Sequence, residues 1–469
     1  MKSPFYFKVV LGMIMCVLLP FSVQSQEVLS LDACIQIALK NNSQFRMAKS
    51  RVDVAGAQVL GAYAQMLPNF SANAGGSQQH QGPSVQDYNT AVYQYDNNGR
   101  PVVGPDGKPV VLRYVKTKNR TDPQIREFFN AGASFSQVIY DGGQWWNRIK
   151  DQSRNKEART YDMQTTRLAT ITSVKQYYFE LLKNQHQLIV LEDAVRLAEE
   201  QLKSSKSRYE IGVAAQIDVF RSQVSVNDSK VNLLTQKNML EVAKTNLNVA
   251  MGREIDVLVV IQEDSTITPL PVSLENALKE AVQSNPRIKS ATEDIASARY
   301  SYKTAKGGLL PTIRFNLGYS RSNPDMQQVY RYFDQNYSYQ YSVSFSLPLF
   351  DGLRTKSNIQ SAAYSMDIAE ENLVDTQRKV SADAKQYYLT LTSNLEKVKM
   401  LEENLVAAEE NLRLARERYN VGAGTLLETI DAQVQLTRAR ISLVSARYDS
   451  KIAQAQLEGA LGKGPQVSE

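Results

Sequence analysis

The chain has few of the side chains on which most enzymes depend for chemistry. Only 2 of its 469 residues are histidine and only 2 are cysteine. His80 and His186 are far apart in the sequence, and neither belongs to a cluster with the spacing of metal ligands. No nucleophile elbow, phosphate-binding loop or paired-cysteine motif occurs. We therefore expect no enzyme activity, no catalytic residue, no metal site and no cofactor.

Long apolar runs are also missing, apart from one at the N-terminus. Lys2 and Lys8 precede an apolar segment that ends in small residues at 22–25, so we predict that residues 1–25 are a cleaved signal peptide. No later apolar stretch approaches the roughly 20 residues of a membrane-spanning helix, so any membrane span must consist of strands. Cys34 would be the only cysteine of the mature chain, and we expect it to pack as a small apolar residue.

The charges are interspersed and show no concentrated basic face. The formal net charge is +6, and removing Lys2 and Lys8 with the signal peptide leaves +4. This balance gives no support to nucleic acid as a partner.

Glycine and proline are both absent from residues 144–211 and 353–421. At about 1.5 Å per residue, each span would form a helix roughly 100 Å long, which suits the wall of a bundle or tube better than a globular core. A glycine turn and a shorter helix, 213–251 or 425–458, follow each span. An earlier helix at 42–66 would stack end to end with the first of these and line the remainder of the long helix.

The two long spans belong to copies of one unit. The apolar positions of 191–209 recur at 401–419, an offset of 210, with alternating spacings of four and three residues. Such spacing is typical of helices wound around partner helices. Upstream the offset is 243, and the difference of 33 between 243 and 210 is an insertion in the first copy. We assign residues 26–262 to a first structural repeat and 263–469 to a second.

Apolar and polar residues alternate at about 312–320 and again at about 337–349, which predicts two strands with different faces. The apolar positions are Ile313, Phe315, Leu317, Tyr319, Tyr337, Tyr339, Tyr341, Val343 and Phe345. A face of tyrosines and apolar residues opposite a serine-rich face suits lipid on one side and water on the other. The alternative is a soluble sheet packed on a core. The matching strands of the first copy, near 69–74 and 131–140, rest mainly on the repeat.

Four strands per chain cannot close a barrel alone, because about eight is the smallest number that does. The chain must therefore associate with copies of itself. Two copies would supply eight strands and three would supply twelve, and these residues alone do not choose between them.

The insertion lies between the first two strands, and we expect it to be an extended surface loop at about 77–130. Pro105-Asp106-Gly107 within it predicts a small hairpin around a tight turn. Lys116, Lys118 and Arg120 give the loop a local positive charge. These charges are either solvated or bind acidic surface sugars.

The joints between helices and strands carry a resemblance to a known family. They comprise Ser346-Leu347-Pro348-Leu349-Phe350-Asp351-Gly352, two Leu-Pro junctions, and the Arg-Tyr-x-x-Gly turns at 208–212 and 418–422. From about residue 29 to 464 the chain resembles the TolC-like outer-membrane efflux channel family. The resemblance implies a mainly α fold with a β membrane part, in which a homotrimer forms a twelve-strand outer-membrane β-barrel on a periplasmic tube of long coiled helices.

The resemblance also implies a function. The protein would be the passive exit channel of a tripartite efflux or secretion system, in the cell outer membrane and extending into the periplasm. Its partners would be a periplasmic adaptor, an inner-membrane pump or transporter, and outer-membrane lipid. The competing interpretation is an exported periplasmic coiled-coil adaptor or structural protein without a pore, although adaptors usually have one hairpin and this chain has two.

By the same resemblance, a gate at the periplasmic tip would use Glu428, Asp431, Asp218 and Tyr419. Glu428 and Asp431 share one helix face, so three chains would place six carboxylates around a narrow axis and concentrate cations. An ordinary solvated pair is the alternative. The gate arginine of the family corresponds here to Gly424, so the closing contacts must differ.

Gly212 and Gly422 would allow the positive φ that a sharp turn between helices needs. The resemblance implies that the residues around these glycines form the surface against which adaptor hairpins dock. They are Ile211, Val213, Val421 and Ala423.

Overall fold

The computed structural model describes residues 28–263 and 273–464. The predicted signal peptide at 1–25 lies outside the described residues. The chain divides into two compact units, and each unit takes segments from both repeats. Unit 1 comprises Met1–Val59, Asp151–Arg299 and Tyr364–Glu469, and unit 2 comprises Leu60–Lys150 and Tyr300–Ala363.

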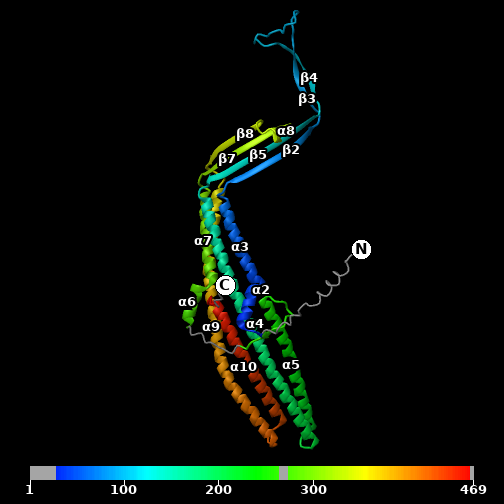
Figure 1. Ribbon diagram of the computed structural model, residues 1–469, viewed down its shortest axis with the longest axis vertical. Helices are drawn as coiled ribbons and strands as arrows, with labels where there is room; N and C mark the ends of the chain where they lie inside the picture. The colour runs from blue at the N-terminus through cyan, green and yellow to red at the C-terminus, as the bar shows by residue number, and fades with distance from the viewer. Residues whose placement is uncertain (1–27, 264–272, 465–469) are drawn as a thin grey trace, which may run out of the picture. The chain divides into compact units, whose positions relative to one another are not determined.

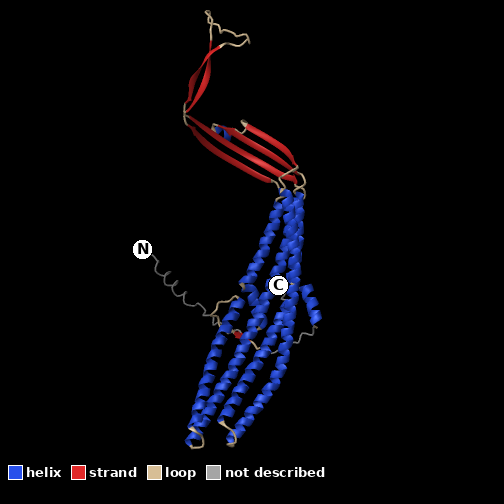
Figure 2. Ribbon diagram, turned by 180° about the vertical axis from the view of Figure 1, so that it is seen from behind, coloured by secondary structure: helices blue, strands red, loops and turns tan. Residues whose placement is uncertain are grey.

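Two hairpins of long helices supply most of unit 1 (Figure 1, Figure 2). Helices α4 (Gln144–Glu210) and α9 (Arg354–Asn420) have 67 residues each, and α5 (Gln216–Met251) and α10 (Leu426–Ala460) return beside them. The two predicted long helices are confirmed to within one residue at each end, because nothing inside them breaks a helix. Among the described residues, no helix combines the length and the apolar character needed to cross a lipid bilayer.

Shorter helices precede each hairpin, and their joints are duplicated atom by atom. Helices α2 (Leu31–Asn41) and α3 (Ser43–Ala64) correspond to α6 (Leu274–Ser284) and α7 (Pro286–Gly307). Asn42 lies at the joint between α2 and α3, and Asn285 lies at the joint between α6 and α7. Their Nδ2 atoms donate to the carbonyl oxygens of Ala250 and Ala460, at 3.1 and 2.9 Å. Each asparagine Oδ1 also accepts from the backbone N–H two residues later, at 2.9 Å. The duplication seen in the sequence therefore extends to individual hydrogen bonds.

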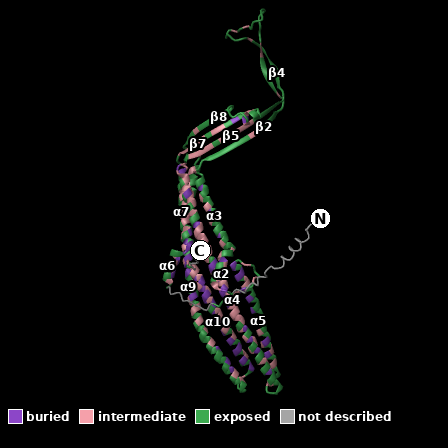
Figure 3. Ribbon diagram, in the orientation of Figure 1, coloured by how far each residue is buried: buried purple, intermediate pink, exposed green. Residues whose placement is uncertain are grey.

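The largest core of unit 1 lies where α2, α4, α5 and α10 meet, and Figure 3 shows buried positions on these helices. Cys34, Leu181, Leu247 and Met251 are fully buried there. Burial raises the pKa of the Cys34 thiol to about 11, so the thiol stays protonated and packs as a small apolar group, as predicted. A short parallel pair, β1 (Val28–Leu29) with β6 (Val260–Ile261), adds Leu29 and Ile261 to this core.

Unit 2 is built on a four-stranded antiparallel sheet in the order β2-β5-β7-β8 (Figure 1). Its strands are β2 (Asn69–Gln81), β5 (Gln124–Tyr140), β7 (Thr312–Asn323) and β8 (Tyr337–Ser346), and helix α8 (Met326–Tyr330) lies between β7 and β8. The predictions of β7 and β8 are confirmed, and both strands begin at the predicted residues, Thr312 and Tyr337. Strand β8 ends before the predicted 349, since Pro348 has no N–H to donate to a ladder.

The prediction of an extended loop at 77–130 is wrong, because most of that segment is strand. Strands β3 (Ser84–Tyr93) and β4 (Val111–Thr121) follow β2 and precede β5 in the sequence, and they pair antiparallel as a separate two-stranded sheet. The chain thus has more strands than the four that the sequence predicts. Polar side chains on both faces of β4 hide its period of two, so the alternation on which the prediction depends is absent.

The small hairpin is confirmed, since Val103 bridges Pro109 and the N–H of Gly107 donates to the carbonyl of Gly104 at 3.0 Å. Pro83 and Pro123 stand where the β2–β5 ladder ends and the β3–β4 ladder begins. A proline cannot donate to a ladder, so the long ribbon is interrupted on both strands at the same level.

Candidate functional site: helix tips and two-faced sheet

The turns between the long helices have one geometry in both copies. In the first, the N–H of Gly212 donates to the carbonyl of Tyr209 at 2.9 Å, and the N–H of Val213 to that of Arg208 at 2.9 Å. In the second, the same two bonds join Gly422 to Tyr419 and Ala423 to Arg418, at 3.2 and 2.8 Å. This is the Schellman arrangement, and both glycines have φ +78. The predicted need for a positive φ at both turns is confirmed.

The side chains around the turn glycines point into solvent. Ile211, Val213 and Val421 are exposed at 74%, 65% and 79%, and Ala423 is also exposed. Helix–helix packing within the chain does not explain apolar side chains with so few contacts. The structure therefore offers an uncovered apolar surface at each turn.

Helix α10 starts beside the second turn and carries Glu428 and Asp431. Thr425 caps the helix, its Oγ1 accepting from the N–H of Glu428 at 3.2 Å. Arg418 lies 3.8 Å from the Glu428 carboxylate and also donates to the carbonyl of Ala423 at 3.2 Å. Asp431 is exposed, and within the described part of the chain it forms no ion pair. The two acids of this helix face are therefore unequal, because only one of them has a cation beside it.

The other two predicted gate residues have partners at or near the ends of the long helices. Asp218 lies in the first turn of α5, and its carboxylate lies 3.9 Å from the guanidinium of Arg221 on the same helix. Tyr419 lies under the guanidinium of Arg208, which is 4.6 Å from the ring centroid. That cation–π contact joins the ends of the two hairpins.

Arg208 and Arg418 are functional candidates that reasoning from the sequence did not select. Their signal was present, since each precedes a tyrosine in the repeated Arg-Tyr-x-x-Gly turn, but nothing in the pattern gives their partners. The departure at Gly424 has a structural explanation. A Cβ on Gly424 would lie 3.1 Å from the Cβ of Arg418 and 3.2 Å from the nitrogen of Tyr419, so the turn leaves little room for a side chain there.

Farther from the tips, a ladder of polar contacts joins the antiparallel helices α4 and α10. It comprises Lys175 with Glu458 at 2.6 Å, Lys183 with Asp449 at 3.1 Å, Gln187 with Ser445 at 2.9 Å and Asp193 with Arg440 at 3.0 Å. Arg440 also binds Glu409 of its own hairpin at 3.2 Å. Hydrogen bonds from Arg196, together with the charge of Arg440, lower the pKa of Asp193. The two hairpins of one chain are thus tied together at Arg440.

The sheet of unit 2 has one apolar face that runs across its strands. The registers place Phe315 opposite Val343 and Leu317 opposite both Tyr341 and Phe135. All nine predicted lipid-facing residues alternate with polar ones along β7 and β8: Ile313, Phe315, Leu317, Tyr319, Tyr337, Tyr339, Tyr341, Val343 and Phe345. Tyr339, Tyr341, Val343 and Phe345 are exposed at 66%, 80%, 67% and 65%. Within residues 28–263 and 273–464, no element covers these four side chains, in contrast to the core-facing side of a soluble sheet.

The opposite face of the sheet is polar. Asn316 lies opposite Ser342, and Ser320 opposite Ser338. On the neighbouring strands, the hydroxyls of Ser71 and Ser134 are 2.7 Å apart. A hydroxyl-rich face can stay in contact with water, so the sheet separates an apolar side from an aqueous side.

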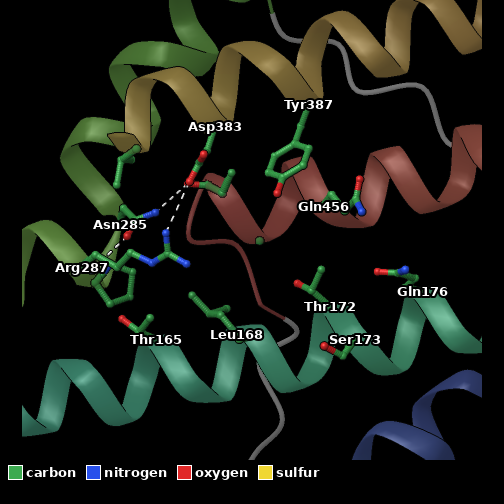
Figure 4. A pocket seen from close by; sticks show the side chains of 15 residues that line it. Thr165, Leu168, Thr172, Ser173, Gln176, Asn285, Arg287, Asp383, Tyr387 and Gln456 are labelled. Atoms are coloured by element: carbon green, nitrogen blue, oxygen red, sulfur yellow. Dashed lines mark hydrogen bonds and ion pairs between the residues drawn. The ribbon is translucent and has the colours of Figure 1, made fainter. Parts of the chain in front are cut away.

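A polar cavity of about 240 Å³ lies in unit 1 between α4, α9, α10 and the joint before α7 (Figure 4). Arg287 lies 3.4 Å from Asp383 at one end of it, beside Asn285. Threonine, serine and glutamine side chains of α4 and α10 line the remainder together with Leu168 of α4 and Val380 and Tyr387 of α9. In the described residues, no group of three or more histidine, cysteine, aspartate or glutamate side chains is placed to hold a metal ion.

Comparison with known proteins identifies related sequences. The family model "Outer membrane efflux protein" matches residues 34–253 and 277–463. Outer membrane protein TolC of Vibrio cholerae is 26% identical over 350 residues, covering 73% of this chain and 79% of that protein. The proteases secretion protein PrtF of Dickeya chrysanthemi is 22% identical over 445 residues, covering 93% of this chain and 89% of that protein.

Solved structures share the fold. The Campylobacter jejuni CmeC outer membrane channel superposes with a TM-score of 0.76 at 18% identity, covering 92% of this chain and 85% of that one. A structure of CusC gives a TM-score of 0.75 at 18% identity, covering 92% of both chains.

Proposed function

Because the chain belongs to the outer membrane efflux protein family, we propose that it is the passive exit channel of a tripartite efflux or secretion system. It resides in the outer membrane and conducts substrates to the exterior. Relatives carry the names of efflux pump outer membrane proteins and of a protease secretion protein. The channel performs no chemistry of its own, and an inner-membrane pump or transporter supplies the energy.

The observation that carries this proposal is the two-faced sheet with open edges. Strands β2 and β8 are its edge strands, and both present unpaired backbone groups. Because the sheet has four antiparallel strands, β8 of one copy runs antiparallel to β2 of the next, and copies can close without a break in the pattern. Three copies supply a twelve-strand barrel, with the tyrosine-rich face toward lipid and the hydroxyl-rich face toward the lumen.

The helical hairpins then form the periplasmic tube, and its tip is the gate. Three copies of Glu428 and Asp431 around one axis would attract cations and resist anions. Asp218 and Tyr419 take part from the neighbouring helix ends. The Arg208–Tyr419 contact supports this assignment, because it holds the two hairpin ends together in the present state.

The apolar turn surface is the proposed docking site for a periplasmic adaptor. Ile211 and Val213 of one turn and Val421 and Ala423 of the other are exposed in the chain. A partner with an apolar hairpin tip would cover them and bring the pump to the channel.

The alternative of a coiled-coil adaptor without a pore fits the structure less well. Such an adaptor needs one hairpin and soluble β domains with covered apolar faces. This chain has two hairpins and a sheet whose apolar face exposes Tyr339, Tyr341, Val343 and Phe345.

The decisive experiment is extraction of the full chain from outer membranes in detergent, followed by mass determination and electron microscopy of the same sample. We expect a particle of three chains with threefold symmetry and a central channel. A soluble monomer or dimer that needs no detergent would overturn the proposal.

A further inference from the structure

The surfaces that join the two hairpins of one chain occur a second time in the repeat, and there they lack a packing partner among the described residues. Helix α10 packs on α4, and the repeat relates α10 to α5 and α4 to α9 by the same 210 positions. A surface that fits in one copy should therefore occur again on α5 and α9. In that second occurrence, the described residues of the chain leave both surfaces uncovered.

The apolar side chains of the contact differ in exposure from their counterparts. Val444 and Ile452 of α10 pack in the same cluster as Phe179 and Leu188 of α4. Their counterparts on α5 are Leu234 and Val242, which are exposed at 70% and 51%. The counterpart of Phe179 on α9 is Leu389, which is exposed at 51%. Side chains that are covered in one hairpin pair are thus open to solvent in their duplicates.

The charged part repeats with the same register. Arg440 binds Glu409 within its hairpin and Asp193 across to α4. The counterpart of Arg440 is Lys230, which binds Glu199 within the first hairpin at 2.7 Å. Glu199 is the counterpart of Glu409, so this ion pair is duplicated.

The remaining member of the duplicated pattern is the counterpart of Asp193. That counterpart is Glu403, an exposed residue of α9 that forms no ion pair among the residues the structure describes. One cation on α5 and one carboxylate on α9 therefore lack the cross-hairpin partner that the internal copy has.

We propose that Lys230 of one copy pairs with Glu403 of the next, and that the exposed apolar line of α5 packs on α9 of that copy. The occupant of this surface is a second copy of the chain, because the chain itself contains the matching geometry and the complementary charges. The contact is head-to-tail, and it generates a ring when the rotation between successive copies closes, as it does in the proposed trimer. The inference rests on the proposed channel assembly and names the contacts that hold its helical part together.

Charge reversal tests the pair in the full-length protein. Glu403→Lys places two cations together between copies but breaks no ion pair seen within the chain, so we expect the oligomer to dissociate in detergent at a temperature several degrees lower. Lys230→Glu should have a similar effect, and the double variant Lys230→Glu/Glu403→Lys should restore most of the loss. Glu402→Lys is the matched control, since Glu402 binds Arg447 of its own hairpin. Loss of the oligomer with Glu402→Lys but not with Glu403→Lys would overturn the inference.

Cross-linking separates this inference from the channel assembly itself. Lys230→Cys/Glu403→Cys, treated with a short bismaleimide, should give linked species up to three chains, while Cys34 stays silent because it is buried and its pKa is about 11. Lys237→Cys/Glu403→Cys, displaced by one heptad or about 10 Å, should link far less. If trimers form but the matched pair links no better than the displaced pair, only the inference fails. If the purified protein is monomeric, the proposed assembly fails with it.

Discussion

Single glycines show how much of the fold depends on backbone geometry. Gly212 and Gly252 both have a positive φ, but they differ in their surroundings. A Cβ on Gly212 would meet nothing within 4 Å, whereas one on Gly252 would lie 2.8 Å from the carbonyl of Asn41. Gly212 therefore serves the conformation of an exposed turn, and Gly252 serves both conformation and close packing.

We expect Gly212→Ala to lower the free energy of unfolding by about 1 kcal/mol, through the left-handed conformation alone. Gly252→Ala should cost roughly 2 to 4 kcal/mol, because overpacking against backbone adds to that strain. Thermal unfolding of the purified variants, followed by circular dichroism, measures the difference. Equal losses would show that the backbone near Asn41 can move aside at little cost.

Two aspartates of unit 1 should respond to pH with opposite sign. Burial raises the pKa of Asp294, and the nearby charge of Asp162 raises it further, against the opposing charge of Arg159. Its ionised form therefore costs stability, and this cost disappears as the pH falls through the raised pKa. Asp193 is the opposite case: its lowered pKa means that its contribution is present at neutral pH and lost as the pH falls through that pKa.

Asp294→Asn should therefore be neutral or stabilising at pH 7, by less than about 1 kcal/mol because solvent screens a partly exposed group. Its advantage should shrink as the pH falls toward the ordinary aspartate value near 3.8. Asp193→Asn should be destabilising at pH 7, and its deficit should shrink over acid pH. Melting temperatures across this range test both signs. A deficit of Asp294→Asn that is largest at neutral pH would contradict the assignment.

At the scale of elements, the sequence predicted what depends on local pattern. The absence of glycine and proline and the repeated apolar spacing were enough to place α4 and α9. The alternation of apolar and polar residues in 312–320 is also a local pattern, and it was enough to place β7. Strands β3 and β4 were not predicted because polar residues occupy both of their faces, for example Asn89 and Thr90 in β3 and Lys118 and Asn119 in β4. The partners of Arg208, Arg418 and Arg440 could not be predicted, since each contact depends on how hairpins far apart in sequence pack together.

Arg440 gives an element-scale prediction, because it ties α10 to both α4 and α9. Arg447 lies one heptad later; in the part of the chain that the structure describes, its one ion pair is with Glu402 of its own hairpin, so it is a matched control. If the gate opens by movement of one hairpin against the other, Arg440→Ala should favour the open state by about 1 kcal/mol per chain, or roughly fivefold. Arg447→Ala should leave the opening equilibrium unchanged.

Single-channel conductance in planar bilayers measures this equilibrium. More frequent openings with Arg440→Ala than with Arg447→Ala would support a hinge between the hairpins. Equal behaviour of the two variants would place the moving contact elsewhere.

At the scale of the whole molecule, duplication explains how one chain can form a tube. Each chain contains two hairpins with similar contact surfaces, and among its described residues one of the two contacts is formed and the other is not. In the proposed ring of copies the other contact would form between neighbours, and the edge strands of the sheets could pair in the same head-to-tail sense. In the proposed trimer, the same symmetry would bring each acidic residue of the tip to the axis three times.

The acids at the tip therefore give a prediction that only the assembled channel can show. A trivalent cation such as hexaamminecobalt(III), added from the periplasmic side, should block the conductance by binding the ring of carboxylates. Asp431→Asn should weaken this block by at least about tenfold, whereas Glu428→Gln should weaken it less, since Arg418 already lies beside Glu428. Arg418→Gln should strengthen the block, and Glu410→Gln, whose carboxylate binds Arg413, is the control. A block that depends on Glu428 more than on Asp431 would show that the Arg418 contact does not persist in the closed ring, and a block that none of these variants alters would place the gate outside these acids.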